Sequence, residues 1–430
     1  MVRSAGVSPP PAKTNKDPFS PFPLGALGGY SNPLPSLTES RVLVSSTTLA
    51  SPTASVSPSV SARPGSGRLL SLDIFRGITI AGMLIVNNPG SWGSIYPPLA
   101  HATWNGWTPT DLIFPFFLFI VGVSIVFAFA GRTAAGADRT ALLKKSVWRG
   151  FKLFALGLIL SGFPYYHLST IRIPGVLQRI ALAFVITAVL FLYTKLNTQV
   201  IVCAVLLLGY WALQALVPAP GVLPGMYEKG ADLGGYIDRA VLGSAHLWSE
   251  AKTWDPEGLL STLPAIATCL SGVFAGLWLR SGRPPHERTN GLFVAGWAAL
   301  VVGLMWHPLF PINKSLWTSS YVMFTSGLAC SFLAICYWLA DIKGWHAWGR
   351  PFQVFGVNAI AAFFLSGLGA RILNLIQVGD GVALKTWLYQ HVFLSVASPI
   401  NASLLFAITY TAFWLGVMWV LYRRRIFIKV

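Results

Sequence analysis

The sequence predicts an all-α fold: a polytopic membrane helix bundle of about ten transmembrane helices, with a disordered N-terminal tail. Of its 430 residues, 54% are hydrophobic and only 10% are charged, and the mean hydropathy is +0.61. A soluble domain carries roughly 25% charged residues. Apolar stretches of about 20 residues, the length that crosses a bilayer as a helix, follow one another through most of the chain. Basic residues gather in alternate loops between these stretches, as in multi-pass membrane proteins.

The N-terminal segment, residues 1–67, differs in composition from the rest. It is rich in Ser, Pro, Thr and Ala and lacks apolar periodicity, so that it cannot bury enough apolar surface to offset the entropy of ordering. It also lacks the compact apolar core and the cleavage site of a signal peptide. We therefore predict two regions, a disordered tail at 1–67 and a transmembrane domain at 68–430.

Ten apolar stretches in the transmembrane domain predict the membrane-spanning helices, and the third and seventh of them are short. The predicted spans are 69–87, 109–130, 149–163, 174–194, 198–217, 257–280, 290–306, 316–340, 352–376 and 400–422. Because this number is even, both termini are expected on the same side of the membrane.

The net charge of +17 comes from 31 Lys and Arg against 14 Asp and Glu, and one set of alternate loops holds most of the basic residues. These loops are 131–148, 195–197, 281–289, 341–351 and 423–430. By contrast, the loop 88–108 contains no Lys or Arg. Since basic loops face the cytoplasm, we predict that both termini are cytoplasmic and that this loop is extracytoplasmic. The same distribution explains the basic excess without nucleic acid, and no soluble segment combines aromatic and basic residues as nucleic-acid-binding modules do.

The four cysteines predict neither a disulfide framework nor a metal site. All lie inside apolar runs, with no CxxC or Cys/His spacing, whereas zinc sites need such spacing. We interpret them as packing residues.

The densest polar cluster lies in the loop between the first two spans and at the helix ends that flank it. Its members are Asn87, Asn88, His101, Trp104, Asn105, Thr108 and Asp111. Thr108, Pro109 and Asp111 have the spacing of a helix start, with Thr108 as cap and Asp111 completing a capping box. The positive end of the helix macrodipole is then expected near His101, where it favours a developing oxyanion.

His101 is the candidate catalytic residue of this cluster. An imidazole can take a proton from an attacking amine or hydroxyl, or it can act as the nucleophile through an acyl-imidazole intermediate, and the sequence leaves both routes open. The structural alternative is an interfacial histidine that only packs against Trp104. Asn87, at the end of the first span, either orients the imidazole, holds an acyl carbonyl or only caps its helix.

Two groups of ionisable residues lie near or inside the predicted membrane, where a charge costs roughly 2.5–3.5 kcal/mol on insertion scales. Asp73 and Arg76 stand three residues apart and hence on one helix face, where they neutralise each other or contact a ligand. Arg172 and Arg179 have no acid nearby in the sequence. An anionic ligand or a distant carboxylate must therefore compensate them.

Two further helix starts carry polar residues on the predicted extracytoplasmic side. Asp255 is placed to cap a helix that begins at Pro256, and the polar face of this helix is expected to line a cavity. Residues 313–318 (NKSLWT) repeat the pattern at the start of a later span.

The chain resembles the heparan-alpha-glucosaminide N-acetyltransferase family, and more closely its bacterial relatives. The stretches that carry the resemblance are 70–77 (LSLDIFRG), 101–106 (HATWNG), 111–119 (DLIFPFFLF), 172–179 (RIPGVLQR), 255–264 and 313–321. The resemblance covers 68–430 and leaves only the tail outside.

The resemblance implies a transmembrane enzyme, an acyl-CoA-dependent N-acetyltransferase that moves an acetyl group from cytoplasmic acetyl-CoA to an amine on the other side. It implies that His101 is the active-site residue and that Asn87 also takes part. The basic candidates for the CoA phosphates are Arg76, Arg149, Lys152 and Arg179. The residues expected to contact substrate or co-substrate are Asp73, Arg76, Trp104, Asn105, Asp111, Arg172, Gln178, Arg179 and Asp255.

The resemblance also implies the partners. Acetyl-CoA is expected as a co-substrate, with no permanently bound cofactor. The expected acceptor is an amino sugar or glycan of the cell envelope at a bacterial inner membrane. Heparan sulfate is not expected, because the low-complexity tail stands where the lysosomal member has a large luminal region. Membrane lipid is a further expected partner, and a homodimer is an open alternative. The alternative function is an amino-sugar transporter or permease of the inner membrane.

Overall fold

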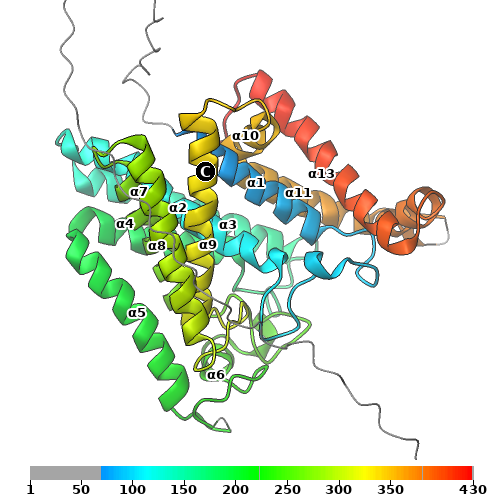
Figure 1. The fold of residues 1–430 in the computed structure, drawn as a ribbon. Helices are drawn as coiled ribbons and strands as arrows, with labels where there is room; N and C mark the ends of the chain where they lie inside the picture. The colour runs from blue at the N-terminus through cyan, green and yellow to red at the C-terminus, as the bar shows by residue number, and fades with distance from the viewer. Residues whose placement is uncertain (1–68, 222, 380, 429–430) are drawn as a thin grey trace, which may run out of the picture. The chain divides into compact units, whose positions relative to one another are not determined.

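A computed structural model describes residues 69–428 apart from 222 and 380, and the chain is helical through most of them (Figure 1). The predicted tail, residues 1–67, lies outside the described residues. The α-helices are α1 (Leu70–Asn87), α2 (Ile113–Ala134), α3 (Arg139–Gly162), α4 (Val176–Tyr193), α5 (Leu196–Leu216), α6 (Leu233–Leu242), α7 (Thr262–Leu279), α8 (Pro285–Trp306), α9 (Ser319–Tyr337), α10 (Arg350–Val357), α11 (Ala359–Leu375), α12 (Leu384–Leu388) and α13 (Pro399–Arg423). The shorter elements are the helical turns η1 (Pro97–Leu99), η2 (Pro109–Leu112), η3 (Ser244–His246), η4 (Trp338–Ile342) and η5 (Tyr389–Phe393), and one antiparallel pair of strands, β1 (Gln377–Val378) and β2 (Val382–Ala383). The predicted all-α bundle is confirmed.

Each of the ten predicted spans coincides with a helix or with a bent pair of helices. In the described part of the chain, eight helices are long and apolar enough to cross a membrane. A ninth crossing results if α10 and α11, which meet at 84°, form one broken span. The predicted span 149–163 falls in α3, which has 24 residues but carries Lys145, Arg149 and Lys152 along its length and is therefore too polar to count with the others. Length and composition thus support eight or nine crossings, fewer than the ten expected.

Helix α2 is held tightly in the bundle by α7. A Cβ atom at Gly122 would lie 1.8 Å from the carbonyl oxygen of Cys269, and one at Gly272 would lie 1.9 Å from that of Phe119. Glycine at such positions lets two membrane helices approach backbone to backbone. The apolar residues of α2 between Phe116 and Ile120 are also buried. Helix α2 is therefore a rigid element, and it holds the residues at its two ends at a fixed distance from each other.

The other helices differ in which helices they contact and in how much of their apolar surface is buried. In Figure 1, α10, α11 and α13 gather around α1, with which each of them is in contact. The most extensive pairs elsewhere are α8 with α9 and α3 with α4. Only 22% of the apolar stretch of α5, 28% of that of α8 and 22% of that of α13 is buried inside the protein. These three helices consequently present the apolar surface that lipid would cover.

Candidate active site

The loop between α1 and α2 closes onto its own helix start through Asp111. One carboxylate oxygen of Asp111 accepts hydrogen bonds from the backbone N–H groups of Ala102 and Thr108, both at 3.0 Å, and from the Thr108 hydroxyl at 3.2 Å. The capping box predicted from Thr108 and Asp111 is thus confirmed, in the turn η2 that leads into α2. Asp111 is buried, and the hydroxyl of Tyr321 donates to its backbone carbonyl at 2.5 Å. The carboxylate is therefore fixed in one orientation.

The second carboxylate oxygen of Asp111 holds the imidazole of His101. Oδ1 lies 2.6 Å from Nδ1 of His101, whose side chain remains 46% exposed. A carboxylate can only accept at this position, so Nδ1 carries a proton. In the neutral imidazole Nε2 then keeps its lone pair and is the basic and nucleophilic nitrogen of the ring. The ring of Trp104 packs against that of Trp254, with ring centroids 5.0 Å apart. The structural alternative for His101 had expected Trp104 to pack against its imidazole.

Lys314 completes this cluster, and sequence reasoning did not assign it. Its Nζ atom lies 3.3 Å from Nδ1 and 3.2 Å from Nε2 of His101. An atom equally far from both ring nitrogens cannot lie on the in-plane lone pair of either, so the ammonium sits beside the ring and leaves the Nε2 lone pair directed elsewhere. Burial lowers the pKa of the Lys314 ammonium, against the raising effects of Glu257 and Asp111. The signal in the sequence was that Lys314 is the only Lys or Arg between Trp306 and Thr318.

Two hydrogen bonds, one between side chains and one between backbone groups, hold the segment around Lys314 against the loop that carries His101. The Asn313 side-chain amide donates to Oδ1 of Asn105 at 3.1 Å, and the backbone N–H of Gly106 donates to the carbonyl of Ile312 at 2.8 Å. The predicted site residue Asn105 is therefore a docking residue in this structure. Trp104 joins another segment to the loop, since its indole N–H donates to the carbonyl of Tyr227 at 2.5 Å.

Asn87 is not the residue that orients the imidazole. It is the last residue of α1 and is exposed. Among the described residues its side chain forms no hydrogen bond with His101, whose Nδ1 is bound by Asp111. The cap of α1 is Asn88, whose side chain donates to the carbonyl of Leu84 at 2.8 Å. For Asn87 the role of holding an acyl carbonyl stays a prediction.

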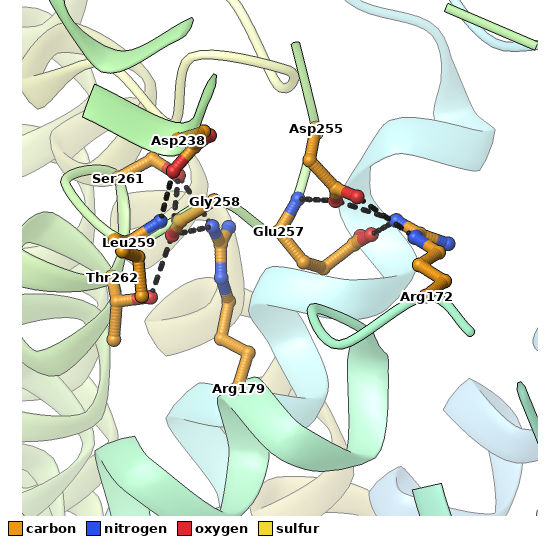
Figure 2. A network of polar contacts seen from close by, with 9 residues as sticks. All are labelled: Arg172, Arg179, Asp238, Asp255, Glu257, Gly258, Leu259, Ser261 and Thr262. Carbon is orange, nitrogen blue, oxygen red and sulfur yellow. Dashed lines mark hydrogen bonds and ion pairs between the residues drawn. The ribbon is translucent and has the colours of Figure 1, made fainter. Parts of the chain in front are cut away.

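The distant carboxylates that Arg172 requires are Asp255 and Glu257 (Figure 2). Arg172 binds both oxygens of Asp255, at 2.8 and 2.6 Å, and Oε2 of Glu257 at 2.5 Å. Burial alone would lower the pKa of Arg172, but the charges of Glu257 and Asp255 raise it above its ordinary value. Asp255 also accepts the backbone N–H of Glu257 at 2.9 Å. An ion pair thus joins the segment before α4 to the segment before α7, and contact of Arg172 or Asp255 with a ligand stays a prediction.

Arg179 lies deeper and serves the same segment. It is 1% exposed, donates to the carbonyl of Gly258 at 3.1 Å and binds the hydroxyl of Ser261, and its guanidinium lies 5.1 Å from the centre of the Trp317 ring. In Figure 2 its side chain extends toward this turn. The neighbouring predicted residue, Gln178, is buried as well. Arg179 does not line the basic pocket described next, and its contact with the CoA phosphates stays a prediction.

A basic pocket of about 640 Å³ lies at the opposite end of α2. Its charged lining residues are Arg76, Arg132, Lys145, Arg149 and Lys152, and its inner wall is apolar. Three of the four arginines and lysines named as phosphate candidates therefore come together. Arg76 is fixed there by an ion pair with Asp73 at 3.1 Å, as their spacing predicted, and by a hydrogen bond to the hydroxyl of Ser124 at 2.7 Å.

These features define a polytopic helical membrane protein with a carboxylate–histidine–lysine cluster at one end of a central helix and a basic pocket at the other. The chain belongs to the heparan-alpha-glucosaminide N-acetyltransferase family, because the family described as "Heparan-alpha-glucosaminide N-acetyltransferase, catalytic" matches residues 68–308. The predicted resemblance is thus confirmed.

Two curated relatives extend the match. The heparan-alpha-glucosaminide N-acetyltransferase of Homo sapiens is 32% identical over 421 residues, which cover 84% of this chain and 60% of the human protein. That of Mus musculus is 31% identical over 424 residues, which cover 86% of this chain and 61% of the mouse protein. The chain therefore spans about three fifths of the length of these relatives.

Proposed function

We propose that this protein is a transmembrane acetyltransferase that moves an acetyl group from acetyl-CoA, bound in the basic pocket, to the amine of an amino sugar or glycan bound near His101. The observation that carries the proposal is the placement of the two sites on one helix. The pocket follows α2 from Arg132 to Phe117. Asp111 stands six residues before Phe117 in the chain, about 9 Å along a helix axis. A long, flexible donor that enters the pocket thus approaches the His101 cluster.

The basic pocket suits the donor in both charge and polarity. CoA carries several phosphate charges, and arginine and lysine at its mouth supply the matching cations. Arg149 and Lys152 are one helical turn apart on α3, so that both reach the same phosphate region. The apolar residues farther in, such as Phe117 and Ile125, suit the less polar arm that carries the thioester.

The chemistry is assigned to Nε2 of His101. In one route Nε2 takes a proton from the acceptor amine as its nitrogen attacks the acetyl carbonyl. In the other, Nε2 attacks the thioester and forms an acyl-imidazole that the amine then resolves. In both routes the carbon–sulfur bond breaks, a carbon–nitrogen bond forms and one amine proton ends on the CoA thiol. Asp111 holds the imidazole in the required tautomer, and the charge of Lys314 is placed to stabilise the oxyanion that develops when the acetyl carbonyl is attacked.

The acceptor is proposed as an amino sugar on the basis of the family. The printed names of the human and mouse relatives specify a glucosaminide as the acceptor. Because this chain spans only about three fifths of those proteins, the proposal is limited to the amine-bearing sugar unit. The side chain of His101 is 46% exposed, so that an acceptor at the surface can reach it.

The direction of transfer is proposed from the loop charges. The basic loops at the pocket end face the cytoplasm under the positive-inside rule, which places His101 on the extracytoplasmic side of an inner membrane. A cysteine introduced at Ser94 should then react with an impermeant thiol reagent in intact cells. A cysteine at Ala137, beyond the end of α2, should react only after permeabilisation. The reverse labelling pattern would overturn the direction of transfer.

Transfer itself is tested in proteoliposomes supplied with radiolabelled acetyl-CoA and glucosamine. Labelled N-acetylglucosamine is the expected product, and His101→Ala should abolish it while the protein stays monodisperse. Internalised but unmodified glucosamine would instead support an amino-sugar carrier. Without an acceptor, stoichiometric release of CoA and labelling of the protein identify the acyl-imidazole route, whereas direct transfer requires the sugar.

A further inference from the structure

A second hollow, of about 540 Å³, lies at the same end of the bundle as the basic pocket but has a separate set of lining residues. They are Gln353, Trp419, Tyr422, Arg423, Arg425 and Phe427. Gln353 belongs to α10, and the others belong to the last turns of α13 and to the segment that follows. The charged groups among them are two arginines, with no carboxylate in the described lining. The hollow therefore has the charge of an anion-binding site.

The two arginines, Arg423 and Arg425, have no carboxylate partner among the described residues. Helix α13 ends in a Schellman motif, in which the N–H of Ile426 binds the carbonyl of Leu421 at 2.9 Å and the N–H of Arg425 binds that of Tyr422 at 3.0 Å. The residue at the position of Arg425 adopts a left-handed conformation, here with φ of 56°, for which glycine is strongly favoured. An arginine in this position stores strain of a kind that often marks a functional site.

The aromatic residues of the hollow form one connected wall on the lipid-facing side of the protein. The ring centroids of Trp419 and Tyr422 are 6.5 Å apart, and those of Tyr422 and Phe427 are also 6.5 Å apart. Just before them, Phe413 of the same helix is 62% exposed, as expected for a helix that faces acyl chains. Trp and Tyr are enriched where the hydrocarbon region gives way to lipid headgroups. The hollow thus combines a headgroup-level aromatic wall with two cations.

We propose that this hollow binds the phosphate headgroup of an anionic phospholipid, with Arg423 and Arg425 holding the phosphate and the acyl chains lying along α13. An occupant that satisfies both the cations and the apolar helix must be anionic at one end and apolar at the other, which a free phosphate or a nucleotide is not. This proposal does not rest on the proposed acetyl transfer.

The same segment separates the lipid hollow from the basic pocket. Asn358, at the bend between α10 and α11, donates to the carbonyl of Ile426 at 3.1 Å and accepts the N–H of Ile428 at 2.9 Å. In this bonded segment, Phe427 lines the lipid hollow, whereas Ile428 lines the basic pocket. A lipid bound against Phe427 therefore supports one wall of the pocket next to it.

Lipid binding is tested with the full-length protein, purified in a non-ionic detergent, and phosphatidylglycerol that carries a fluorescent acyl chain. The phosphatidylcholine analogue is the neutral reference. Wild type should bind the anionic lipid more tightly than the neutral one. Because a basic residue near a membrane contributes about fivefold to the binding of anionic lipid, Arg423→Gln/Arg425→Gln should weaken phosphatidylglycerol binding roughly 30-fold.

Two variants serve as controls for this experiment. Arg424→Gln removes the same charge from between the two arginines, but Arg424 does not line the hollow, so it should lose at most the about fivefold expected of one basic residue near a membrane, well short of the roughly 30-fold loss in the double variant. Arg425→Gly should fold at least as stably as wild type, because glycine suits the left-handed position, and should still lose about fivefold in binding. The melting temperature in phosphatidylcholine alone reports the folding of each variant.

Three results would overturn the proposal. The first is equal weakening by Arg424→Gln and by the double variant, which would indicate a general effect of charge. The second is unchanged binding in Arg425→Gly and in the double variant. The third is displacement of the lipid by inorganic phosphate or by acetyl-CoA, which would show that the arginines hold a soluble anion.

Discussion

Oδ1 of Asp111 lies 2.6 Å from Nδ1 of His101, while the other oxygen of the same carboxylate anchors the backbone of Ala102 and Thr108. One buried side chain thus fixes both the tautomer of the imidazole and the loop that carries it. The orientation of the candidate catalytic group is therefore built into the start of α2.

Replacing Asp111 by Asn should impair acetyl transfer much more than donor binding. An amide can donate to Nδ1 and so favours the tautomer with the proton on Nε2, which removes the lone pair needed for catalysis. Loss of a general base costs about 10² to 10⁴ in rate, and we expect a decrease of kcat in this range. Initial rates and calorimetric binding of acetyl-CoA measure the two effects separately.

A matched control removes another hydrogen bond from the same turn. The hydroxyl of Thr110 donates to the carbonyl of Pro98 at 3.1 Å and forms no hydrogen bond with His101 in the described part of the chain. Thr110→Val should keep activity within about tenfold of wild type, since one neutral hydrogen bond contributes about 1 kcal/mol. If Thr110→Val loses as much activity as Asp111→Asn, the loop and not the tautomer limits the reaction.

Lys314 should support the chemistry of His101 through its charge. Its Nζ atom lies 3.2 Å from Nε2 of His101, where a cation can stabilise the oxyanion that develops when the acetyl carbonyl is attacked. Lys314→Met removes this charge and should lower kcat by about 10² or more. Lys314→Arg keeps the charge and should retain much more of kcat than Lys314→Met. Equal losses of kcat in the two variants, with unchanged melting temperatures, would exclude this role.

Local sequence patterns predicted those parts of the site that lie close together in the chain. The capping box of Thr108 and Asp111 and the pair of Asp73 and Arg76 each span three residues, and both are present. The contact between Lys314 and His101 joins residues 213 positions apart. A single sequence contains no signal for such a distance, because helix packing alone decides which loops meet.

The same limit applies to Arg172 and Arg179. The sequence showed that Arg172 and Arg179 need compensation, which follows from the cost of burying a charge. The carboxylates that compensate Arg172 lie 83 and 85 residues away. The sequence alone does not distinguish a ligand from a protein carboxylate as the partner of Arg172, because it does not show that the segment before α7 lies beside the segment before α4.

Donor binding should depend on the basic residues of the pocket and not on Arg179. Arg149→Gln and Lys152→Gln each remove one charge from the lining, and loss of a charge-assisted hydrogen bond of about 1.5–3 kcal/mol should raise the KM for acetyl-CoA roughly tenfold or more. Lys144→Gln is the matched control, since Lys144 is exposed on the same helix and does not line the pocket. Arg179→Gln should lower the melting temperature and leave the KM of the remaining folded protein unchanged. A selective rise of KM in Arg179→Gln would return this residue to the donor site.

Asp238 should make the stability of the protein depend on pH near neutrality. This buried carboxyl accepts the backbone N–H of Leu259 at 2.8 Å, next to the turn that Arg179 holds (Figure 2). Burial, with a contribution from the charge of Asp255, raises the pKa of Asp238 from 3.8 to about 7. The folded state therefore binds the proton more tightly than the unfolded state. This contribution to stability is fully present below pH 3.8 and is lost as the pH rises through about 7.

Replacing Asp238 by Asn tests this linkage because the amide does not titrate, while its oxygen can still accept the N–H of Leu259. The free energy of unfolding of Asp238→Asn, relative to wild type, should increase between pH 3.8 and about 7 and then level off, by up to a few kcal/mol. Thermal melting of both proteins in the same detergent over this range measures the difference. Glu250→Gln removes an exposed carboxyl and is the control for the general effect of losing one negative charge. A constant difference between Asp238→Asn and wild type across the range would mean that the Asp238 carboxyl is already ionised in the folded protein at low pH, with a partner that compensates its charge.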